Sequence, residues 1–332
     1  MRMLILGGTE FVGHTTATVA VARGHEVVCV ARGSRRRPPT GTAFVKVDRG
    51  AGLDAYASLS GDWDAVVEVS WDPRRVRDAV TVLGGRSRHW TYVSSTSVYA
   101  DNATVGQDES APLVAPLRPG QAVDRDHYAE AKVASERVVL HALGDRTHVV
   151  RPGLIGGAMD TSDRFGYWVA RFERDNEPVL IPDVRGSAQV IAVRDLAEWM
   201  VRSAEGQVTG VHNAVGDPVR LGEVYRLARE VAHSKAEMVA AAPDWLSEMN
   251  VSYWAGQESL PLWLPQDYTG FATRSNAAAK AAGLTLRPLR ELMAESLAFE
   301  KQLGLRRDRQ AGLSGARELA LIQLWQGRDL SL

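Results

Sequence analysis

Tyr128 and Lys132, four residues apart, are the side chains of this chain best suited to moving a proton. They lie in the run Tyr-Ala-Glu-Ala-Lys, and apolar residues continue at helical spacing as far as Leu140. Side chains at positions i and i+4 share one face of a helix. A lysine cation beside a phenol favours the phenolate, which makes the tyrosine a usable acid or base near neutral pH. The pair therefore predicts proton transfer to or from a substrate oxygen.

A glycine cluster near the N-terminus, Gly7-Gly8-Thr9-Glu10-Phe11-Val12-Gly13, has the composition of a phosphate-binding turn. It follows the apolar run Met3 to Leu6 and precedes a helical pattern from Phe11 to Arg23. At such a junction, backbone amides and the helix dipole can hold a pyrophosphate. Gly7 would make the tight turn, and Gly13 would let the helix pack closely on the sheet. A glycine pair in an ordinary turn is the alternative interpretation.

Three motifs together, Gly7 to Gly13, Ser94 to Tyr99 and Tyr128 to Lys132, resemble those of the extended short-chain dehydrogenase/reductase family, also called the NAD-dependent epimerase/dehydratase family. The resemblance extends over nearly the whole chain. One residue departs from the pattern, because Glu10 stands where the family usually has the middle glycine. A carboxylate at this position must point away from the pyrophosphate.

The resemblance implies a helper for the tyrosine among four consecutive hydroxyl residues, Ser94 to Ser97. The family has this hydroxyl three residues before a Val-Tyr pair, which is Ser95 here, with Thr96 as the alternative. Ser95 would hydrogen-bond the substrate oxygen and stabilise its developing charge while Tyr128 moves the proton. A polar strand end with capping hydroxyls is the other interpretation.

The end of the second expected strand bears on the choice of cofactor. NAD-selective folds have an acidic residue there that binds the ribose hydroxyls, whereas this chain has Ala31 followed by Arg32. Arg32, with Ser34, Arg35 and Arg36, could bind the 2′-phosphate of NADP. We therefore expect NADP, with NAD as the alternative. A solvated basic loop would explain the same residues without a ligand.

The family resemblance implies further cofactor contacts, which lie at the ends of the later strands. Lys132 would hold the nicotinamide ribose. The other contacts would be Asp48, Val69, Ser70, Ser94, Pro152, Gly153 and Leu154, beside Thr9, Glu10, Phe11 and Val12 of the glycine run.

Two contacts that relatives make to nucleotide sugars are missing. Leu154 replaces an asparagine, and Ala188 replaces an arginine. We therefore expect a reductase acting on a less charged substrate rather than a nucleotide-sugar epimerase. Trp71, Ser95, Thr96 and Tyr128 are the predicted substrate contacts, and the aromatic residues Tyr253, Trp254 and Trp263 could cover the cleft or pack in a core.

Short β-rich runs alternate with helical patterns through the first 150 residues. This alternation predicts an α/β fold with a doubly wound parallel (Rossmann) sheet. We expect a dinucleotide-binding domain over 1–153, to which roughly 188–215 return. A smaller, mostly C-terminal α/β substrate-binding region would comprise 154–187 and 216–332. Long loops are expected over 109–126 and 254–271, of the kind that often cover a binding site.

The composition excludes several classes of protein. The chain has 332 residues, 45% of them hydrophobic, with a net charge of -1, so no overall field favours nucleic acid or a membrane surface. Its single cysteine, Cys29, cannot form an internal disulfide, and no histidine spacing suggests a metal site. No apolar run approaches the roughly 18 residues of a membrane helix, and the N-terminal run is too short for a secretion signal, so we expect a cytoplasmic protein.

The sequence-based hypothesis is an NADP-dependent biosynthetic reductase that moves a hydride between nicotinamide and a carbonyl of a small metabolite, with Ser95, Tyr128 and Lys132 as catalytic residues. The first alternative is a nucleotide-sugar epimerase or dehydratase with tightly bound NAD. The second is a non-catalytic nucleotide-sensing or RNA-associated protein. No nucleic-acid or membrane partner is expected, and a homodimer is possible.

Overall fold

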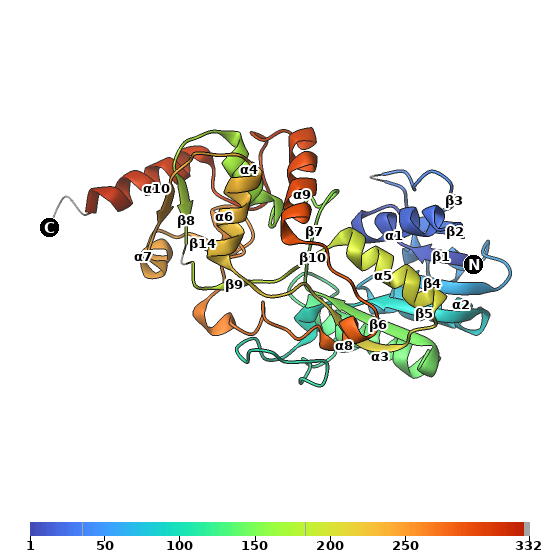
Figure 1. Ribbon diagram of the computed structural model, residues 1–332. Coiled ribbons are helices and arrows are strands. Elements are labelled where there is room, and N and C mark those ends of the chain that lie inside the picture. The colour runs from blue at the N-terminus through green and yellow to red at the C-terminus, as the bar shows by residue number, and fades with distance from the viewer. Residues whose placement is uncertain (35, 183, 329–332) are drawn as a thin grey trace.

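The computed structural model describes residues 1–34, 36–182 and 184–328, so the predicted contribution of Arg35 lies outside the described residues. Its central element is a parallel sheet of seven strands, in which β1 lies between β2 and β4 (Figure 1). In spatial order the strands are β3 (Ala43–Lys46), β2 (Glu26–Ala31), β1 (Arg2–Leu6), β4 (Trp63–Glu68), β5 (Ser87–Val93), β6 (Thr147–Pro152) and β11 (Gly210–Ala214). This order and the parallel pairing confirm the predicted doubly wound fold.

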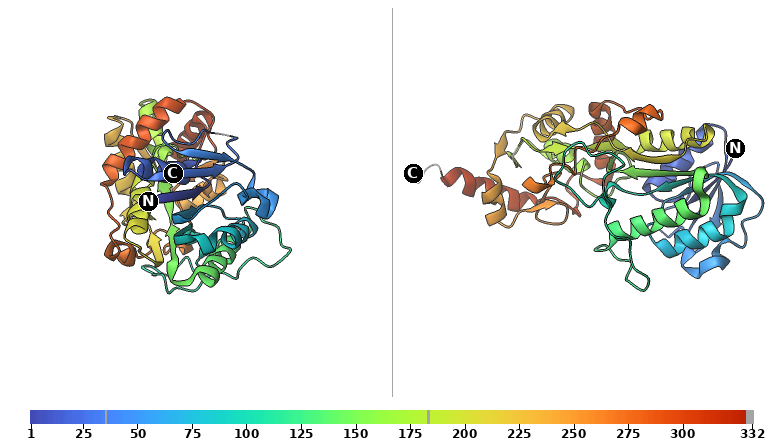
Figure 2. Two further views of the ribbon diagram at one scale, coloured as in Figure 1. Left: turned by 90° about the vertical axis from the view of Figure 1, so that its right-hand side faces the viewer. Right: turned by 90° about the horizontal axis from the view of Figure 1, so that it is seen from below.

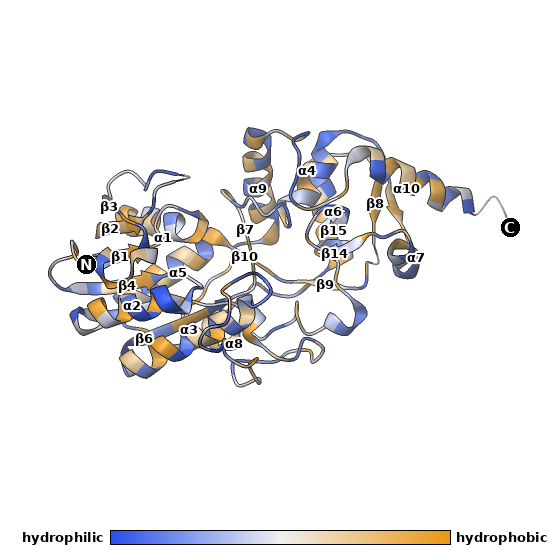
Figure 3. Ribbon diagram, turned by 180° about the vertical axis from the view of Figure 1, so that it is seen from behind, coloured by the Kyte–Doolittle hydropathy of each residue, from blue (hydrophilic) through white to orange (hydrophobic). Residues whose placement is uncertain are grey.

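Helices cover both faces of the sheet, as Figure 2 shows. On one face α1 (Phe11–Ala22) packs against α5 (Val193–Glu205), and on the other α2 (Pro73–Leu83) packs against α3 (Tyr128–Leu143). Because both faces are covered, the central strand β1 is apolar after its first residue, and Met3, Leu4, Ile5 and Leu6 are fully buried. The hydrophobic colouring of the strands is visible in Figure 3.

Two of the crossovers between strands are not α-helical. A loop joins β2 to β3, and the 3₁₀ segment η1 (Arg49–Tyr56) joins β3 to β4. Three further 3₁₀ turns, η2 (Gly84–Arg86), η3 (Thr96–Val98) and η4 (Gly144–Arg146), lie next to β5 and β6. The η3 turn carries the run of hydroxyl residues away from the carboxyl end of β5.

A second group of elements, here called the C-terminal lobe, lies beside the carboxyl ends of the sheet strands (Figure 1). It comprises α4 (Gly166–Arg174), β8 (Val179–Ile181), β9 (Ser187–Ala188), β12 (Val219–Arg220), α6 (Leu221–Val231), β13 (Met238–Ala240), α7 (Pro243–Glu248), β14 (Ser252–Trp254), β15 (Ser259–Pro261), α9 (Leu289–Leu303) and α10 (Gly315–Gly327). Its core is aromatic, with Trp168 stacked on Tyr225 at 4.4 Å between ring centroids. The lobe thus has a hydrophobic core separate from those of the sheet.

The chain passes between the sheet and the lobe several times. The parallel pair β7 (Leu154–Gly156) and β10 (Val190–Ala192) connects them, and α8 (Ala277–Ala281) returns from the lobe to pack on β11. The segment 101–127 has neither helix nor strand and meets 269–275, where the Gly106 amide donates to the Thr273 carbonyl at 3.0 Å. The 3₁₀ turn η5 (Gln266–Tyr268) lies just before this contact. The predicted loop 109–126 thus lies at the boundary between sheet and lobe, whereas the predicted loop 254–271 contains β15 and η5.

Among the described residues, none of the helices has the length and apolar character that crossing a bilayer requires.

Candidate active site

The glycine loop between β1 and α1 fits a dinucleotide. Gly7 has a φ of +105°, and a Cβ there would lie 2.3 Å from Cγ2 of Val69. A Cβ on Gly13 would lie 2.2 Å from the Gly7 carbonyl oxygen. No side chain caps the N-terminus of α1, so its first amides remain free for an anion. Only glycines allow this turn and this close approach of helix to loop.

Glu10, the departure from the family pattern, is the N-cap residue of α1 and is exposed. Its side chain makes no capping hydrogen bond. Glu10 and Arg36 both line a cleft that Tyr128 and Lys132 also line, here called the active-site cleft. The charges of both residues act on the pKa of His14, which burial lowers. A cation thus stands near the carboxylate at the pyrophosphate end of the cleft.

At the adenosine end, Ala31 ends β2 and Arg32 follows as an exposed side chain. The Asp48 carboxylate accepts from the Gly50 amide at 2.8 Å, and that bond, with smaller effects of Arg75 and Arg32, lowers the pKa of Asp48. Ser34 is exposed as well. Arg32 therefore has Asp48 nearby, and it is free to contact a ligand in solution.

The catalytic candidates meet at the carboxyl ends of β4 and β5. The Lys132 Nζ donates to the Val93 carbonyl at 2.6 Å and to the Ser70 carbonyl at 3.4 Å, and it lies 5.9 Å from the Tyr128 ring centroid. Lys132 is only 3% exposed, and burial lowers its pKa to about 7. The Trp71 ring packs on Tyr128 at 5.5 Å. The first turn of α3 thus places both residues beside the strand ends.

The pKa of Tyr128 differs from the sequence-based expectation. Burial raises this pKa, while a hydrogen bond with Ser95 and the charge of Arg164 oppose the rise. Lys132 was expected to lower it, but its own cation is destabilised by the same burial. Ser95 is held in place at the start of η3, where its Oγ accepts from the Ser97 amide at 3.1 Å.

A buried network supports the hydroxyl run from beneath. Ser94 Oγ donates to Glu136 at 2.5 Å, and Arg151 binds the same carboxylate through two bonds of 2.9 and 2.7 Å. Arg151 also donates to the Tyr99 hydroxyl at 3.0 Å, which donates to Asn213 at 2.6 Å. Ser94, predicted as a cofactor contact, therefore has its hydrogen committed to Glu136, although it still lines the cleft.

The structure brings most of the predicted site residues to one cleft of about 610 Å³. Those that line it are Glu10, Phe11, Val12, Arg36, Val69, Ser94, Ser95, Thr96, Tyr128, Lys132, Pro152, Gly153 and Leu154. Eight predicted site residues do not line the cleft. Five of them are next to lining residues or in the glycine loop: Gly7, Thr9, Gly13, Ser70 and Trp71. The other three are on the adenosine side: Arg32, Ser34 and Asp48. Of the aromatic candidates only Trp254 lines the cleft, since Trp263 is buried in the lobe core with Tyr253 packed on it at 4.0 Å.

Sequence reasoning missed the opposite wall of the cleft. Asp160 and Arg164, on the loop between β7 and α4, line it together with Phe271 and Gln310. Burial raises the pKa of Asp160 and lowers that of Arg164. A single charged residue in a loop has no periodicity or motif that marks it, so one sequence offers no signal for these positions.

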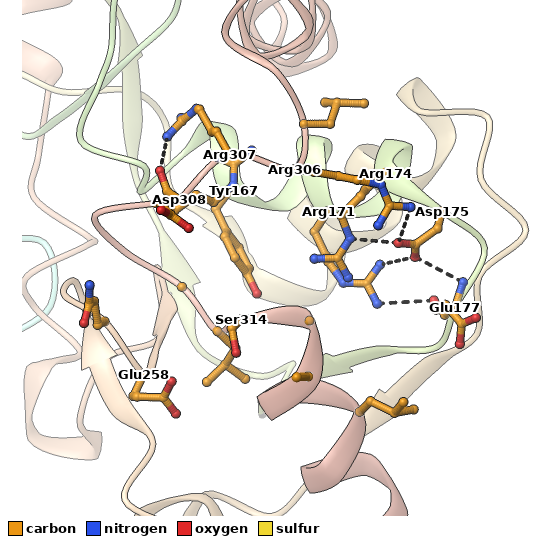
Figure 4. Close-up of a pocket in the computed structure, with 18 of the residues that line it drawn as sticks. Tyr167, Arg171, Arg174, Asp175, Glu177, Glu258, Arg306, Arg307, Asp308 and Ser314 are labelled. Atoms are coloured by element: carbon orange, nitrogen blue, oxygen red, sulfur yellow. Dashed lines mark hydrogen bonds and ion pairs between the residues drawn. The ribbon is translucent and has the colours of Figure 1, made fainter.

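A second cavity of about 700 Å³, here called the lobe cavity, lies within the C-terminal lobe between α4, α10 and the segment 305–309. Figure 4 shows Arg171 and Arg174 directed at Asp175. Arg171 binds Asp175 at 3.0 Å and Glu318 at 2.5 Å. The charges facing this cavity are therefore largely paired with one another.

A model of the NAD dependent epimerase/dehydratase family matches residues 73–222, which include the hydroxyl run and the Tyr128–Lys132 pair. This match agrees with the family resemblance inferred from the motifs. It begins after the glycine loop and ends at the second residue of α6. No curated protein matches the chain.

Solved structures of epimerases share the fold of this chain. The UDP-glucuronic acid 4-epimerase of Bacillus cereus, in complex with NAD, has a TM-score of 0.65 at 14% identity over 91% of this chain and 99% of its own. The UDP-glucose 4-epimerase of Thermotoga maritima, with UDP-glucose, has a TM-score of 0.65 at 16% identity over 91% and 99%. The UDP-Glc/GlcNAc 4-epimerase of Campylobacter jejuni has a TM-score of 0.67 at 14% identity over the same shares.

These comparisons favour the epimerase/dehydratase alternative over the NADP-dependent reductase that the sequence led us to expect. The family is defined by NAD, and NADP finds no support among the relatives described. At these identities the structures establish the fold, while substrate and reaction have to be argued from the site.

Proposed function

We propose that this protein is a nicotinamide-dinucleotide-dependent epimerase or dehydratase, which oxidises a substrate alcohol and returns the hydride before the product leaves. One observation carries the proposal: Tyr128, Ser95 and the buried Lys132 converge at the strand ends that the glycine loop also faces. Ligands of doubly wound sheets bind at this edge. The family match over this region supports a closed reaction cycle over a net reduction.

Gly7, Gly13 and the N-terminus of α1 would hold the pyrophosphate of the cofactor, and Lys132 its nicotinamide ribose. A nicotinamide dinucleotide supplies the acceptor and donor of the hydride. Tyr128 exchanges a proton with the substrate hydroxyl, and Ser95 hydrogen-bonds the same oxygen as its charge changes. The Val93 and Ser70 carbonyls accept hydrogen bonds from Lys132 Nζ and so hold this group beside the Tyr128 ring.

A second candidate, an NADP-dependent reductase, is favoured by one local feature. Ala31 provides no carboxylate for the ribose hydroxyls, and Arg32 is exposed next to that position. A guanidinium binds a 2′-phosphate well through paired charge-assisted hydrogen bonds. In this case the cofactor would exchange at every turnover.

Cofactor retention separates the two candidates. The purified protein is gel-filtered and denatured, and the released dinucleotide is identified by mass spectrometry. Calorimetry then measures binding of NAD, NADH, NADP and NADPH. Oxidised dinucleotide that survives gel filtration supports the epimerase/dehydratase proposal, and rapid exchange with a preference for the phosphorylated pair supports the reductase. Binding of none of the four contradicts both.

A further inference from the structure

Arg164 occupies an unusual position on the wall of the active-site cleft opposite the glycine loop. Its guanidinium lies 5.5 Å from the Trp254 ring centroid, and its Nε donates to Ser162 Oγ at 3.2 Å. It is near enough to Tyr128 for each charge to affect the pKa of the other group. The side chain thus borders the space in which a substrate hydroxyl would meet Tyr128.

The other buried arginines of the described chain have partners that account for their charge. Arg49, Arg151 and Arg171 each bind a buried carboxylate within hydrogen-bonding distance. Arg274 lacks a carboxylate but donates to the Asp101 carbonyl, Asn102 and Gln107. Across residues 1–34, 36–182 and 184–328, by contrast, no carboxylate oxygen lies within 4.0 Å of the Arg164 guanidinium.

The loop that carries Arg164 is held in a costly backbone conformation. Met159 and Asp163 have φ values of +73° and +58°, which non-glycine residues rarely adopt. The fully buried Asp163 carboxylate is bound by Arg307 and Arg309, each at 3.0 Å, and by the Gln310 amide at 2.7 Å. This anchor fixes the residue next to Arg164, so the guanidinium is directed into the cleft by a rigid loop.

The cleft as a whole favours anions. Arg36, Arg125, Lys132 and Arg164 line it, against the carboxyl groups of Glu10 and Asp160. Arg36 lies near the pyrophosphate end with Glu10, whereas Arg164 lies at the Trp254 end. Asp160 is near enough for its charge to raise the pKa of Arg164, but the two side chains form no ion pair within 4.0 Å. Holding a partly buried cation without a directly bound counter-ion is unfavourable unless a ligand supplies one.

We propose that Arg164 binds an anionic group of the substrate, a carboxylate or a phosphate ester, and that the substrate is therefore an anionic hydroxy compound held with its charge close to the reacting carbon. The planar fork of the guanidinium matches both groups in two parallel hydrogen bonds. Trp254 covers the guanidinium from one side and limits its movement. This inference rests on the proposed function, because it takes Tyr128 as the site of reaction.

Calorimetry on the full chain with four probes tests it, with and without saturating NAD. D-glucose, D-glucuronate and glucose 1-phosphate share a sugar ring and differ in charge, and UDP tests a nucleotide diphosphate without a sugar. We expect glucuronate or glucose 1-phosphate to bind more tightly than glucose, and which of the two binds identifies the anion. Arg164→Gln should weaken that binding about 10-fold or more, and Arg164→Lys should restore it in part.

Arg88→Gln is the matched control, because Arg88 is an exposed arginine away from the cleft and its variant should bind as the wild type does. Thermal unfolding shows that each variant is folded. Anion binding that is unchanged in Arg164→Gln, or no anion binding better than glucose, would overturn the inference. Arg164-dependent anion binding by a protein that binds no dinucleotide would instead contradict the proposed function alone.

Discussion

The active-site cleft and the lobe cavity are similar in size, about 610 and 700 Å³, and both are rich in arginine, yet their arginines are used in opposite ways. In the lobe cavity Arg171 and Arg174 share Asp175 and Glu318 in a cluster whose charges cancel. In the cleft Arg164 forms no ion pair within 4.0 Å among the described residues, and the Asp160 charge acts on it only from farther away.

The difference shows that the number of charged side chains in a cavity says little about ligand binding. Breaking an internal pair leaves an uncompensated buried charge and costs stability. Removing a cation that has no internal partner costs little stability but deprives a ligand of its contact. Substitutions in the lobe cavity should therefore lower stability, whereas substitution of Arg164 in the active-site cleft should weaken ligand binding.

Tyr128→Phe should give the largest effect, a loss of turnover without a loss of stability. Loss of the phenolic proton should lower turnover by about 10²- to 10⁴-fold, the usual contribution of a positioned acid or base. Dinucleotide affinity by calorimetry and the melting temperature should stay close to wild type, because the ring is retained. Near-normal turnover on a true substrate would remove Tyr128 from the mechanism.

Glu318→Ala should give the largest effect on stability, through the lobe cavity. The Glu318 carboxylate is 1% exposed, accepts from Arg171 and from the Leu180 amide, and would leave Arg171 buried without that partner. We expect the free energy of unfolding to fall by about 3–5 kcal/mol in urea denaturation.

Glu173→Ala, which breaks the more exposed pair with Lys301, serves as the control and should change stability far less. If Glu318→Ala unfolded at the same urea concentration as wild type, the lobe cluster would not be structural. Arg164→Gln should also stay close to wild type in this assay.

Lys132→Met should change how stability depends on pH. The folded protein releases the Lys132 proton near pH 7, whereas the unfolded chain holds it to about pH 10.5. Between these values the unfolded state binds one more proton, so this lysine makes unfolding free energy rise with pH, by at most about 1.4 kcal/mol per unit. Below pH 7 its unfavourable contribution is constant.

Urea denaturation at several pH values between 6 and 9.5 measures this difference. The methionine variant should be more stable than wild type at pH 6, and its advantage should shrink as pH rises. Parallel pH curves for the two proteins would show that Lys132 is not buried as a strained cation.

Arg32→Ala should give the smallest effect, a change in the affinity for NADP. If Arg32 binds a 2′-phosphate, its removal should weaken NADP binding about 10-fold and leave NAD binding unchanged. Equal affinities for NAD and NADP in the wild type would assign Arg32 to the solvent-exposed surface and strengthen the NAD-dependent proposal.

The sheet and one wall of the cleft could be predicted from the sequence because each depends on local signals. Strand ends, the glycine turn and the Tyr128–Lys132 spacing are set within a few residues of one another, and parallel strands bring their carboxyl ends to one edge. The predicted helix from Phe11 to Arg23 is observed as α1, Phe11–Ala22.

The other wall could not be predicted, because contacts distant in sequence create it. Arg164 reaches the cleft only because Asp163 is held by Arg307 and Arg309, more than 140 positions later. In the sequence these arginines have the composition of a solvated basic segment, whereas the structure places them in ion pairs with Asp163 and Glu300. The pKa of Tyr128 escaped prediction for a related reason, since burial depends on the complete cleft.

The anchoring of Asp163 by Arg307, Arg309 and Gln310 also has a consequence for the order in which the molecule is made. Synthesis proceeds from the N-terminus, and domains generally fold as they emerge. Tyr128 and the glycine loop are present once about half of the chain exists, but the residues that fix the loop of Arg164 come within the last 26 positions. A growing or truncated chain therefore has the reactive groups before it has the wall that selects what they act on.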